Sequence, residues 1–259
     1  MAFLLSFCNN CADLDRVNKA HIILLPKCPA PATPKDFRAI SLQNCPVKII
    51  TKILTTRLQR HIGDLIDIDQ TGFIKGRSIS ENFVYATELV QLCHKRKIPT
   101  VVLKLDFAKA FDSVCWDSTL KILYARGFLD KWLIWMQQLF ISSHSAVKVN
   151  GCPGNWIRSR RGLRQGDALS PYLFLLVADV LQRMIKTEGS IRHPIHDGPC
   201  PVLQYADDTL LLVRADVVDI RKLKKVLADF SAATGLKINY SKSTLVPMHI
   251  QQGTLDRIL

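Results

Sequence analysis

The sequence predicts an α+β fold, and three observations lead to this class. Apolar residues recur at helical spacing in some segments and alternate as in strands in others, without the regular strand–helix order of a doubly wound sheet. The chain has 259 residues, of which 48% are hydrophobic, so it can bury a substantial core. No internal repeat or low-complexity tract is visible. This length allows one large domain or two subdomains.

The charge balance indicates a polyanionic partner. Lysine and arginine number 35 and aspartate and glutamate 22, which gives a formal net charge of +13. Nucleic acid and an acidic membrane surface both fit such a surplus. The most apolar run, residues 172–181, is about half the ~20 residues that span a bilayer and contains Asp179. A protein that binds a membrane surface would need a basic amphipathic helix with exposed apolar residues, whereas the helical segments here have ordinary core stripes. We therefore expect no membrane partner. The first seven residues do not resemble a signal peptide, so we expect a protein that is not secreted, with nucleus or cytoplasm left open.

Three elements are predicted in the first hundred residues. Residues 21–25 form a short apolar run, typical of a buried strand, before a loop rich in proline. Residues 46–62 carry one apolar stripe at helical spacing, and Gly63 follows as a stop signal. Another helix begins at the capping-box pattern of Ser78 and ends before Pro99.

The middle of the chain predicts a strand and two helices. Residues 100–107 alternate between apolar residues on one face and mixed residues on the other. Two helices follow, separated by Gly127, with Asp117 and Asp130 expected as their N-caps.

Two hairpins are predicted in the second half. Residues 145–149 and 156–159 flank an Asn150-Gly151 pair, a strong signal for a tight turn. The other hairpin, residues 202–213, has two aspartates at its tip.

The remaining C-terminal elements are mostly helical. A helix is expected from Ser170, and another ends near Gly235. Short strands at 236–239 and 243–247 complete the prediction.

The aspartates of this basic chain indicate a metal site. Asp106 follows a strand, and Asp207 and Asp208 lie at a hairpin tip. Carboxylates that converge at the ends of adjacent strands repel each other unless a cation is present. Magnesium prefers such oxygen ligands and bridges them to phosphates. Ordinary turn chemistry or helix capping also explains each residue taken alone.

The eight cysteines do not predict a metal site. Only Cys8 and Cys11 have the spacing of metal ligands, and no second pair follows. Scattered cysteines without a secretory signal fit a reducing compartment.

Seven ordered blocks of the sequence resemble motifs of one enzyme family. The segments VVLKLDFAKAFDSV, GLRQGDALSPYLF and YADDT resemble three core motifs of reverse transcriptases. The supporting blocks are ILLPK, RAISL, QTGFIKGRSISEN and GLKINYSKS. Over residues 17–246, this combination resembles the reverse transcriptase of non-LTR (LINE-type) retrotransposons of the plant type. Ala39 and Ala168 depart from the family pattern, which usually has proline at both positions.

The resemblance implies the fingers and palm of a right-hand polymerase, with an antiparallel palm sheet. Residues 1–100 and a hairpin at 145–160 would form the fingers. The palm would be built from residues 101–144 and 161–248, and residues 249–259 would be a truncated tail. The thumb is expected to be missing.

The resemblance also implies the reaction. It is RNA-directed DNA polymerisation, in which two Mg²⁺ ions (or Mn²⁺) support nucleotidyl transfer from a dNTP to a primer 3′-hydroxyl. An RNA template and a DNA primer would be the partners, and the oligomeric state stays open. Asp106, Asp207 and Asp208 would be catalytic and would hold the metals, with Asp106 and Asp207 the principal ligands. The alternative is a catalytically inactive retrotransposon remnant that retains only nucleic-acid binding.

Further site residues follow from the matched motifs. The residues expected to bind the nucleotide are Lys27, Arg38, Phe111 and Gln165. The residues expected to contact the template are Gly72, Lys75, Gly76, Arg77 and Arg164. Either Lys237 or Lys242 would donate a proton to the leaving pyrophosphate. Without the motifs, Phe111 would be interpreted as a core aromatic and Lys27 as a solvated loop residue. The glycines of the 162–167 loop would let the backbone approach a nucleotide closely.

Overall fold

The computed structural model describes residues 2–258 and divides the chain into two compact units. Unit 1 comprises residues 1–61 and 111–174, and unit 2 comprises residues 62–110 and 175–259. The predicted division into fingers and palm stays a prediction. Residues 62–100 belong to unit 2 because their long helix packs on its sheet. Among the described residues, no helix combines the length and apolar character needed to cross a membrane.

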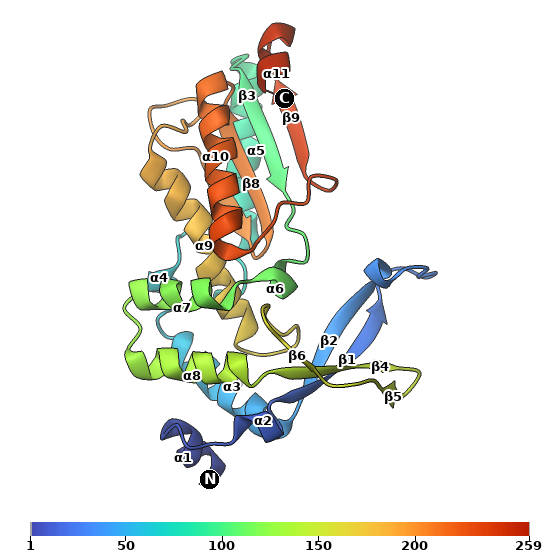
Figure 1. Cartoon of the computed structure of the whole chain (residues 1–259). Helices are drawn as coiled ribbons and strands as arrows, with labels where there is room; N and C mark the ends of the chain where they lie inside the picture. Colours follow the sequence, from blue (N-terminus) through green and yellow to red (C-terminus); the bar gives the residue numbers. More distant parts are fainter. Residues whose placement is uncertain (1, 259) are drawn as a thin grey trace. The chain divides into compact units, whose positions relative to one another are not determined.

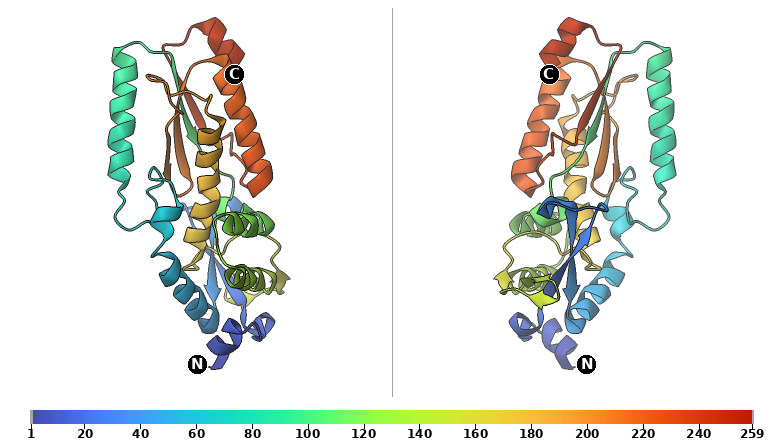
Figure 2. Two further views of the ribbon diagram at one scale, coloured as in Figure 1. Left: turned by 90° about the vertical axis from the view of Figure 1, so that its left-hand side faces the viewer. Right: turned by 90° about the vertical axis from the view of Figure 1, so that its right-hand side faces the viewer.

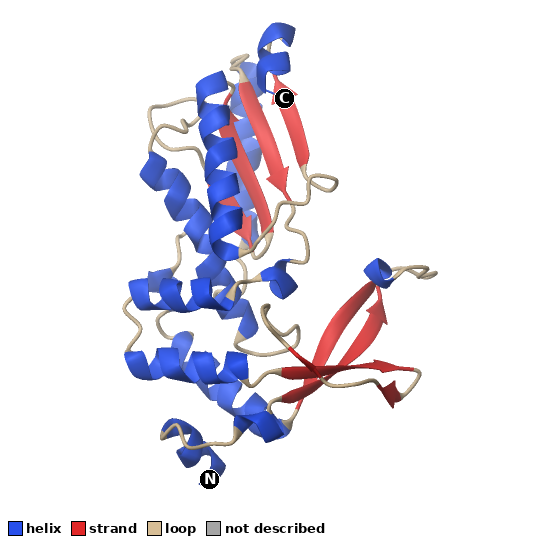
Figure 3. Cartoon of the chain, in the orientation of Figure 1, coloured by secondary structure: helices blue, strands red, loops and turns tan. Residues whose placement is uncertain are grey.

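Unit 1 contains a mixed sheet (Figure 3). In its described part, five strands follow the order β2-β1-β4-β5, with β6 also beside β4: β1 (Lys19–Pro26), β2 (Phe37–Gln43), β4 (His144–Val149), β5 (Cys152–Pro153) and β6 (Ile157–Arg158). Strand β1 is antiparallel to β2 and parallel to β4. Asn150 and Gly151 join β4 to β5 with φ angles of 49° and 84°. The predicted tight turn is therefore confirmed, since such turns require two positive φ angles.

From residue 45 onward the helices of unit 1 lie close to their predicted positions, whereas the two short helices before residue 18 were not predicted. They are α1 (Ala2–Cys8), α2 (Leu14–Val17), α3 (Cys45–Leu58), α7 (Trp116–Ala125) and α8 (Asp130–Ile141), with a 3₁₀ turn at Pro34–Asp36. The predicted N-caps Asp117 and Asp130 are wrong, because Cys115 and Leu129 occupy those positions. Both aspartates lie in the first turn instead, where the helix dipole still favours negative charge.

Unit 2 is built on an antiparallel sheet (Figures 1 and 3). Within its described residues, four strands follow the order β7-β8-β3-β9: β3 (Thr100–Leu105), β7 (Val202–Tyr205), β8 (Asp208–Arg214) and β9 (Thr244–Met248). The predicted strand at 236–239 is reduced to one bridge between Phe107 and Ile238. The helix α11 (Gln252–Ile258) was not predicted.

Helices cover both faces of the unit 2 sheet, as Figure 2 shows. On one face, α5 (Ile79–Lys95) packs with Leu203 and Leu212. On the other face, α10 (Val217–Thr234) lies beside Val101 and Leu105, which line one apolar pocket with its leucines. The predicted stop at Gly235 is confirmed by its left-handed conformation, with φ of 82°. Unit 2 also includes α4 (Ile62–Leu65) and most of α9 (Ser170–Glu188), whereas α6 (Ala110–Ser113) crosses the boundary between the units.

A buried histidine in unit 2 is held neutral. His193 is 4% exposed, and its Nδ1 accepts hydrogen bonds from the amides of Ile195 and His196. Its Nε2 lies 3.2 Å from the hydroxyl of Tyr85. Burial, followed by the charges of His196 and Arg214, lowers the pKa of His193 to about 4. The folded protein therefore resists protonation at this ring.

We expect His193 to make the fold sensitive to mild acid. Between pH 6.5 and about 4 the unfolded chain binds a proton that the folded ring does not, so the free energy of unfolding falls as the pH falls. Urea denaturation at pH 7, 5.5 and 4.5 measures this loss. His193→Gln should flatten the dependence, whereas parallel curves for variant and wild type would contradict the assignment.

Candidate active site at the end of the antiparallel sheet

Three aspartates lie at the same end of the unit 2 sheet. Asp207 occupies the two-residue turn between β7 and β8, in which Tyr205 pairs with Asp208. Leu105, the last residue of β3, pairs with Thr209 of β8. Asp106 therefore leaves β3 at the level of Asp208. Register alone brings together residues that lie about a hundred positions apart in sequence.

The electrostatics of the site also connect the three carboxylates. Burial raises the pKa of Asp207, and the negative charges of Asp208 and then Asp106 raise it further. Asp208 is more exposed, and its Oδ1 lies 3.7 Å from the Nζ of Lys104. The site thus concentrates negative charge that one lysine only partly offsets.

The donor set suits a hard divalent cation, although no ready-made coordination group is present. Among residues 2–258, no three histidine, cysteine, aspartate or glutamate side chains are arranged to hold a metal ion. Carboxylate oxygens are nevertheless the ligands that magnesium prefers. A cation would relieve the repulsion that raises the pKa of Asp207.

The 235–243 segment supports the backbone of Asp106. The Asn239 amide donates to the Asp106 carbonyl at 2.8 Å, and the Asp106 amide donates to Ser243 Oγ at 3.1 Å. The Ala108 amide donates to the Lys237 carbonyl at 2.8 Å. Both candidate proton donors, Lys237 and Lys242, therefore belong to a segment bonded beside the first aspartate. Sequence reasoning missed Ser243, and its only signal was a hydroxyl inside a matched block.

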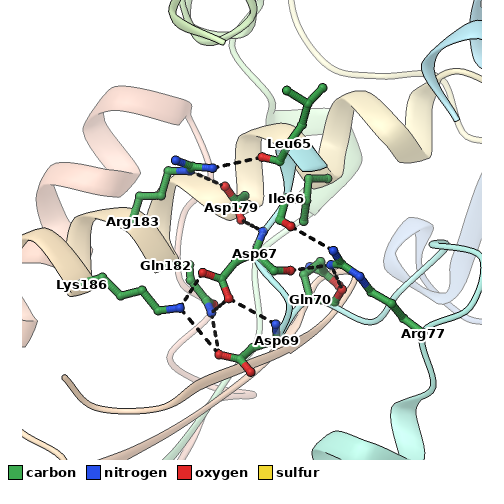
Figure 4. A network of polar contacts seen from close by, with 10 residues as sticks. All are labelled: Leu65, Ile66, Asp67, Asp69, Gln70, Arg77, Asp179, Gln182, Arg183 and Lys186. Atoms are coloured by element: carbon green, nitrogen blue, oxygen red, sulfur yellow. Dashed lines mark hydrogen bonds and ion pairs between the residues drawn. The ribbon is translucent and has the colours of Figure 1, made fainter. Parts of the chain in front are cut away.

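Arg77 has a role inside the protein that differs from the expected template contact. Its guanidinium donates to the backbone carbonyls of Gly63, Ile66, Asp67 and Gln70. Figure 4 shows three of these bonds beside a second network. There, the buried Asp179 accepts from the amide of Asp67 and pairs with Arg183. The guanidinium thus has a structural role in this loop, and its template contact stays a prediction. Template contact by Lys75, which is exposed, stays a prediction for unit 2.

Gly72 is buried against the turn that carries Asp207. A Cβ at this position would lie 2.5 Å from the backbone nitrogen of Ala206. The glycine is therefore explained by close packing on the protein, which does not support its predicted template contact. Gly76 has a φ of 85°, and nothing lies within 4 Å of a Cβ built there.

In unit 1, the β1–β2 hairpin carries the residues expected to grip a triphosphate. Arg38 pairs with Leu25 across the hairpin, and the Lys27 amide donates to the Asp36 carbonyl at 2.7 Å. The Lys27 ammonium donates to the Lys35 carbonyl at 2.8 Å. The Gln165 carbonyl accepts from the Ser41 amide of β2 at 2.8 Å. The basic loop at residues 160–167, which contains Gln165, thus lies beside β2, the strand that carries Arg38.

Phe111 is half-buried in an aromatic stack. Its ring lies on Phe174 with the centroids 4.7 Å apart and the planes 15° apart. Phe174 is fully buried. A core role and a partly exposed sugar-facing role both agree with this position.

The two glycines of the basic loop, Gly162 and Gly166, lie close to backbone of the protein itself. The close approach to a nucleotide that the sequence suggests for them stays a prediction. A Cβ on Gly162 would lie 2.7 Å from the Asp112 carbonyl oxygen, and one on Gly166 would lie 3.2 Å from the Ser41 carbonyl oxygen. Arg164 donates to the side chain and carbonyl of Asn18 and to the His144 carbonyl. Burial lowers the pKa of Arg164 to about 10. Arg164 thus joins three segments of unit 1, and its template contact stays a prediction.

Comparison with known proteins relates the chain to reverse transcriptases and to proteins of transposable elements. A family model described as reverse transcriptase (RNA-dependent DNA polymerase) matches residues 25–251. The chain is 30% identical over 239 residues to a "Retrovirus-related Pol polyprotein from type-2 retrotransposable element R2DM" of Drosophila melanogaster, covering 92% of this chain and 22% of the relative. It is 29% identical over 229 residues to a "Transposon TX1 uncharacterized 149 kDa protein" of Xenopus laevis, covering 87% of this chain and 17% of the relative. The chain thus spans about a fifth of these relatives.

Solved structures of similar fold include telomerases. The apo telomerase of Candida tropicalis, truncated from its C-terminal domain, matches with a TM-score of 0.60 at 13% identity. The match covers 92% of this chain and 51% of that one. Telomerase of the same organism in complex with a TWJ fragment of telomeric RNA matches with a TM-score of 0.59 at 12% identity, covering 89% and 41%.

Proposed function

Because this chain belongs to the reverse transcriptase family, we propose that it synthesises DNA on an RNA template. It has the right-hand polymerase fold, including the antiparallel sheet. Its homologues include Pol proteins of non-LTR retrotransposons, and nucleotidyl transfer is the general function of the family. The plant-type assignment stays a prediction. The observation that carries the proposal is the meeting of Asp106, Asp207 and Asp208 at one end of the unit 2 sheet.

Enzymes of this family generally use divalent metal ions. We propose that Asp106 and Asp207 are the principal ligands of two Mg²⁺ ions (or Mn²⁺) and that Asp208 assists them. Bound divalent ions activate an attacking oxygen and stabilise a leaving one in phosphoryl transfer. The three carboxylates supply the negative charge of the site. The Asn239 amide and the Ser243 hydroxyl bond the backbone of Asp106 and so position it.

Nucleic-acid template and primer are the partners expected of this family. Within unit 1, Lys27 and Arg38 would bind the triphosphate, and Gln165 would lie at the base. Phe111 would favour deoxynucleotides by excluding a 2′-hydroxyl. In unit 2, Lys237 or Lys242 would protonate the departing pyrophosphate.

The test is primer extension by the purified chain. We expect poly(rA)/oligo(dT), dTTP and Mg²⁺ to yield extended primer, with more than about a hundred-fold loss in Asp207→Asn because a charged metal ligand is removed. Asp229→Asn, an exposed aspartate on α10, is the matched control and should keep wild-type rates.

Binding at increasing salt separates the remaining outcomes. The net charge of +13 predicts RNA binding that weakens steeply with salt. If wild type and Asp207→Asn both fail to extend the primer while both retain this binding, the chain is an inactive remnant.

A further inference from the structure

The turn that carries Asp207 has an unusual backbone. Ala206, the first residue of the turn, has a φ of 56°. The φ of Asp207, the second residue, is not positive. A two-residue turn with one positive φ at its first position strongly favours glycine there. An alanine in this conformation is strained, because its Cβ crowds the neighbouring backbone. The surrounding structure must therefore hold the turn in place.

The side chain of Gln70 bonds to both backbone polar groups of Ala206. Gln70 is fully buried. Its Oε1 accepts from the Ala206 amide at 2.9 Å, and its Nε2 donates to the Ala206 carbonyl at 3.2 Å. The same Oε1 accepts from the Gly72 amide at 3.0 Å. One primary amide thus ties the turn to the 69–72 segment.

Backbone bonds fix that segment against strand β7. The Thr71 amide donates to the Gln204 carbonyl at 2.9 Å, and the Gln204 amide donates to the Asp69 carbonyl at 3.0 Å. Asn82 of α5 donates its Nδ2 to both carbonyls, at 3.2 and 2.7 Å. These bonds fix the backbone on either side of Gln70, so its side-chain amide faces Ala206 in one orientation.

We propose that Gln70 is a positioning residue that sets the carboxylates of Asp207 and Asp208 by holding Ala206 in its strained conformation. This inference rests on the proposed function, since it assigns Gln70 a task in the same reaction. Gln70 bonds only to the backbone of Ala206 among the turn residues described. Any effect of Gln70 on the reaction would therefore pass through the placement of the neighbouring aspartates.

Amide hydrogen exchange tests the structural half of the inference without requiring activity. In the full-length chain, Gln70→Met should speed exchange in the 203–209 segment at least ten-fold. The control is Gln182→Met. Gln182 is equally buried and supports the same loop through Asp67 and Asp69, at 2.8 and 3.1 Å. Equal exchange in the two variants would overturn the proposal.

Steady-state kinetics test the catalytic half. Gln70→Met should lower kcat for dTTP incorporation 10–100-fold, the range typical of residues that orient metal ligands. The KM for dTTP should stay within about three-fold, and the Mg²⁺ concentration at half-maximal rate should rise. Gln182→Met should lose stability without these kinetic changes.

The outcomes separate the two hypotheses. If wild type extends primers and Gln70→Met matches Gln182→Met in kcat and Mg²⁺ dependence, the positioning role is wrong and the proposed function stands. If wild type does not extend primers while exchange still separates the variants, the proposed function is wrong, and Gln70 only stabilises the turn.

Discussion

Gly162→Ala is expected to lower the free energy of unfolding by about 3 kcal/mol or more. Gly162 has a φ of 86°, in the region that L-residues rarely adopt, and the new Cβ would lie 2.7 Å from the Asp112 carbonyl oxygen. The loop cannot move aside easily. The Gly162 amide donates to the Val114 carbonyl at 2.8 Å, and its carbonyl accepts from Trp116 Nε1 at 2.7 Å.

Thermal unfolding followed by circular dichroism measures this effect. For a chain of this size, 3 kcal/mol corresponds to a Tm lowered by roughly 6–12 °C. Gly127→Ala is the matched control, because Gly127 lies in the same unit with φ of 80° and nothing lies within 4 Å of its added Cβ. It should cost only about 1–2 kcal/mol, the penalty of the left-handed conformation alone. Equal losses in the two variants would show that backbone conformation alone explains Gly162.

Arg77→Lys is expected to lower the free energy of unfolding by about 2 kcal/mol or more. The guanidinium donates to four carbonyls of its own loop, and an ammonium on a flexible stem cannot span them. The bonds to Ile66, Asp67 and Gln70 are partly buried, and a hydrogen bond from a charged donor contributes about 1.5–3 kcal/mol. The substitution keeps the positive charge, so a phosphate contact would survive it.

Urea denaturation and RNA binding together distinguish the two roles of Arg77. Lys75→Gln is the control from the same loop, since its side chain is exposed. This variant should change stability by less than about 0.5 kcal/mol. It should also lower the slope of log affinity for RNA against log salt concentration by about 1, the effect of losing one phosphate contact. If Arg77→Lys retained full stability but lost RNA binding, the template role would be correct.

The local elements and the family membership were accessible from the sequence, because both depend on short-range signals. Alternation at 100–107 and the Asn150-Gly151 turn depend on neighbouring residues, and the structure has both elements. The matched blocks identified the reverse transcriptase family that the family model also assigns. The N-caps at Asp117 and Asp130 were misplaced by one or two residues, since caps depend on backbone angles that composition does not specify.

Residue roles that depend on long-range packing were decided by the tertiary structure. Arg77, Gly72 and Arg164 occur in motifs expected to meet nucleic acid, yet their contacts lie within the protein. Gln70 opens a matched block, but no role was predicted for it, because its partner Ala206 is 136 positions away in sequence. A motif shows which residue types are present, whereas only the folded backbone determines which donor reaches which acceptor.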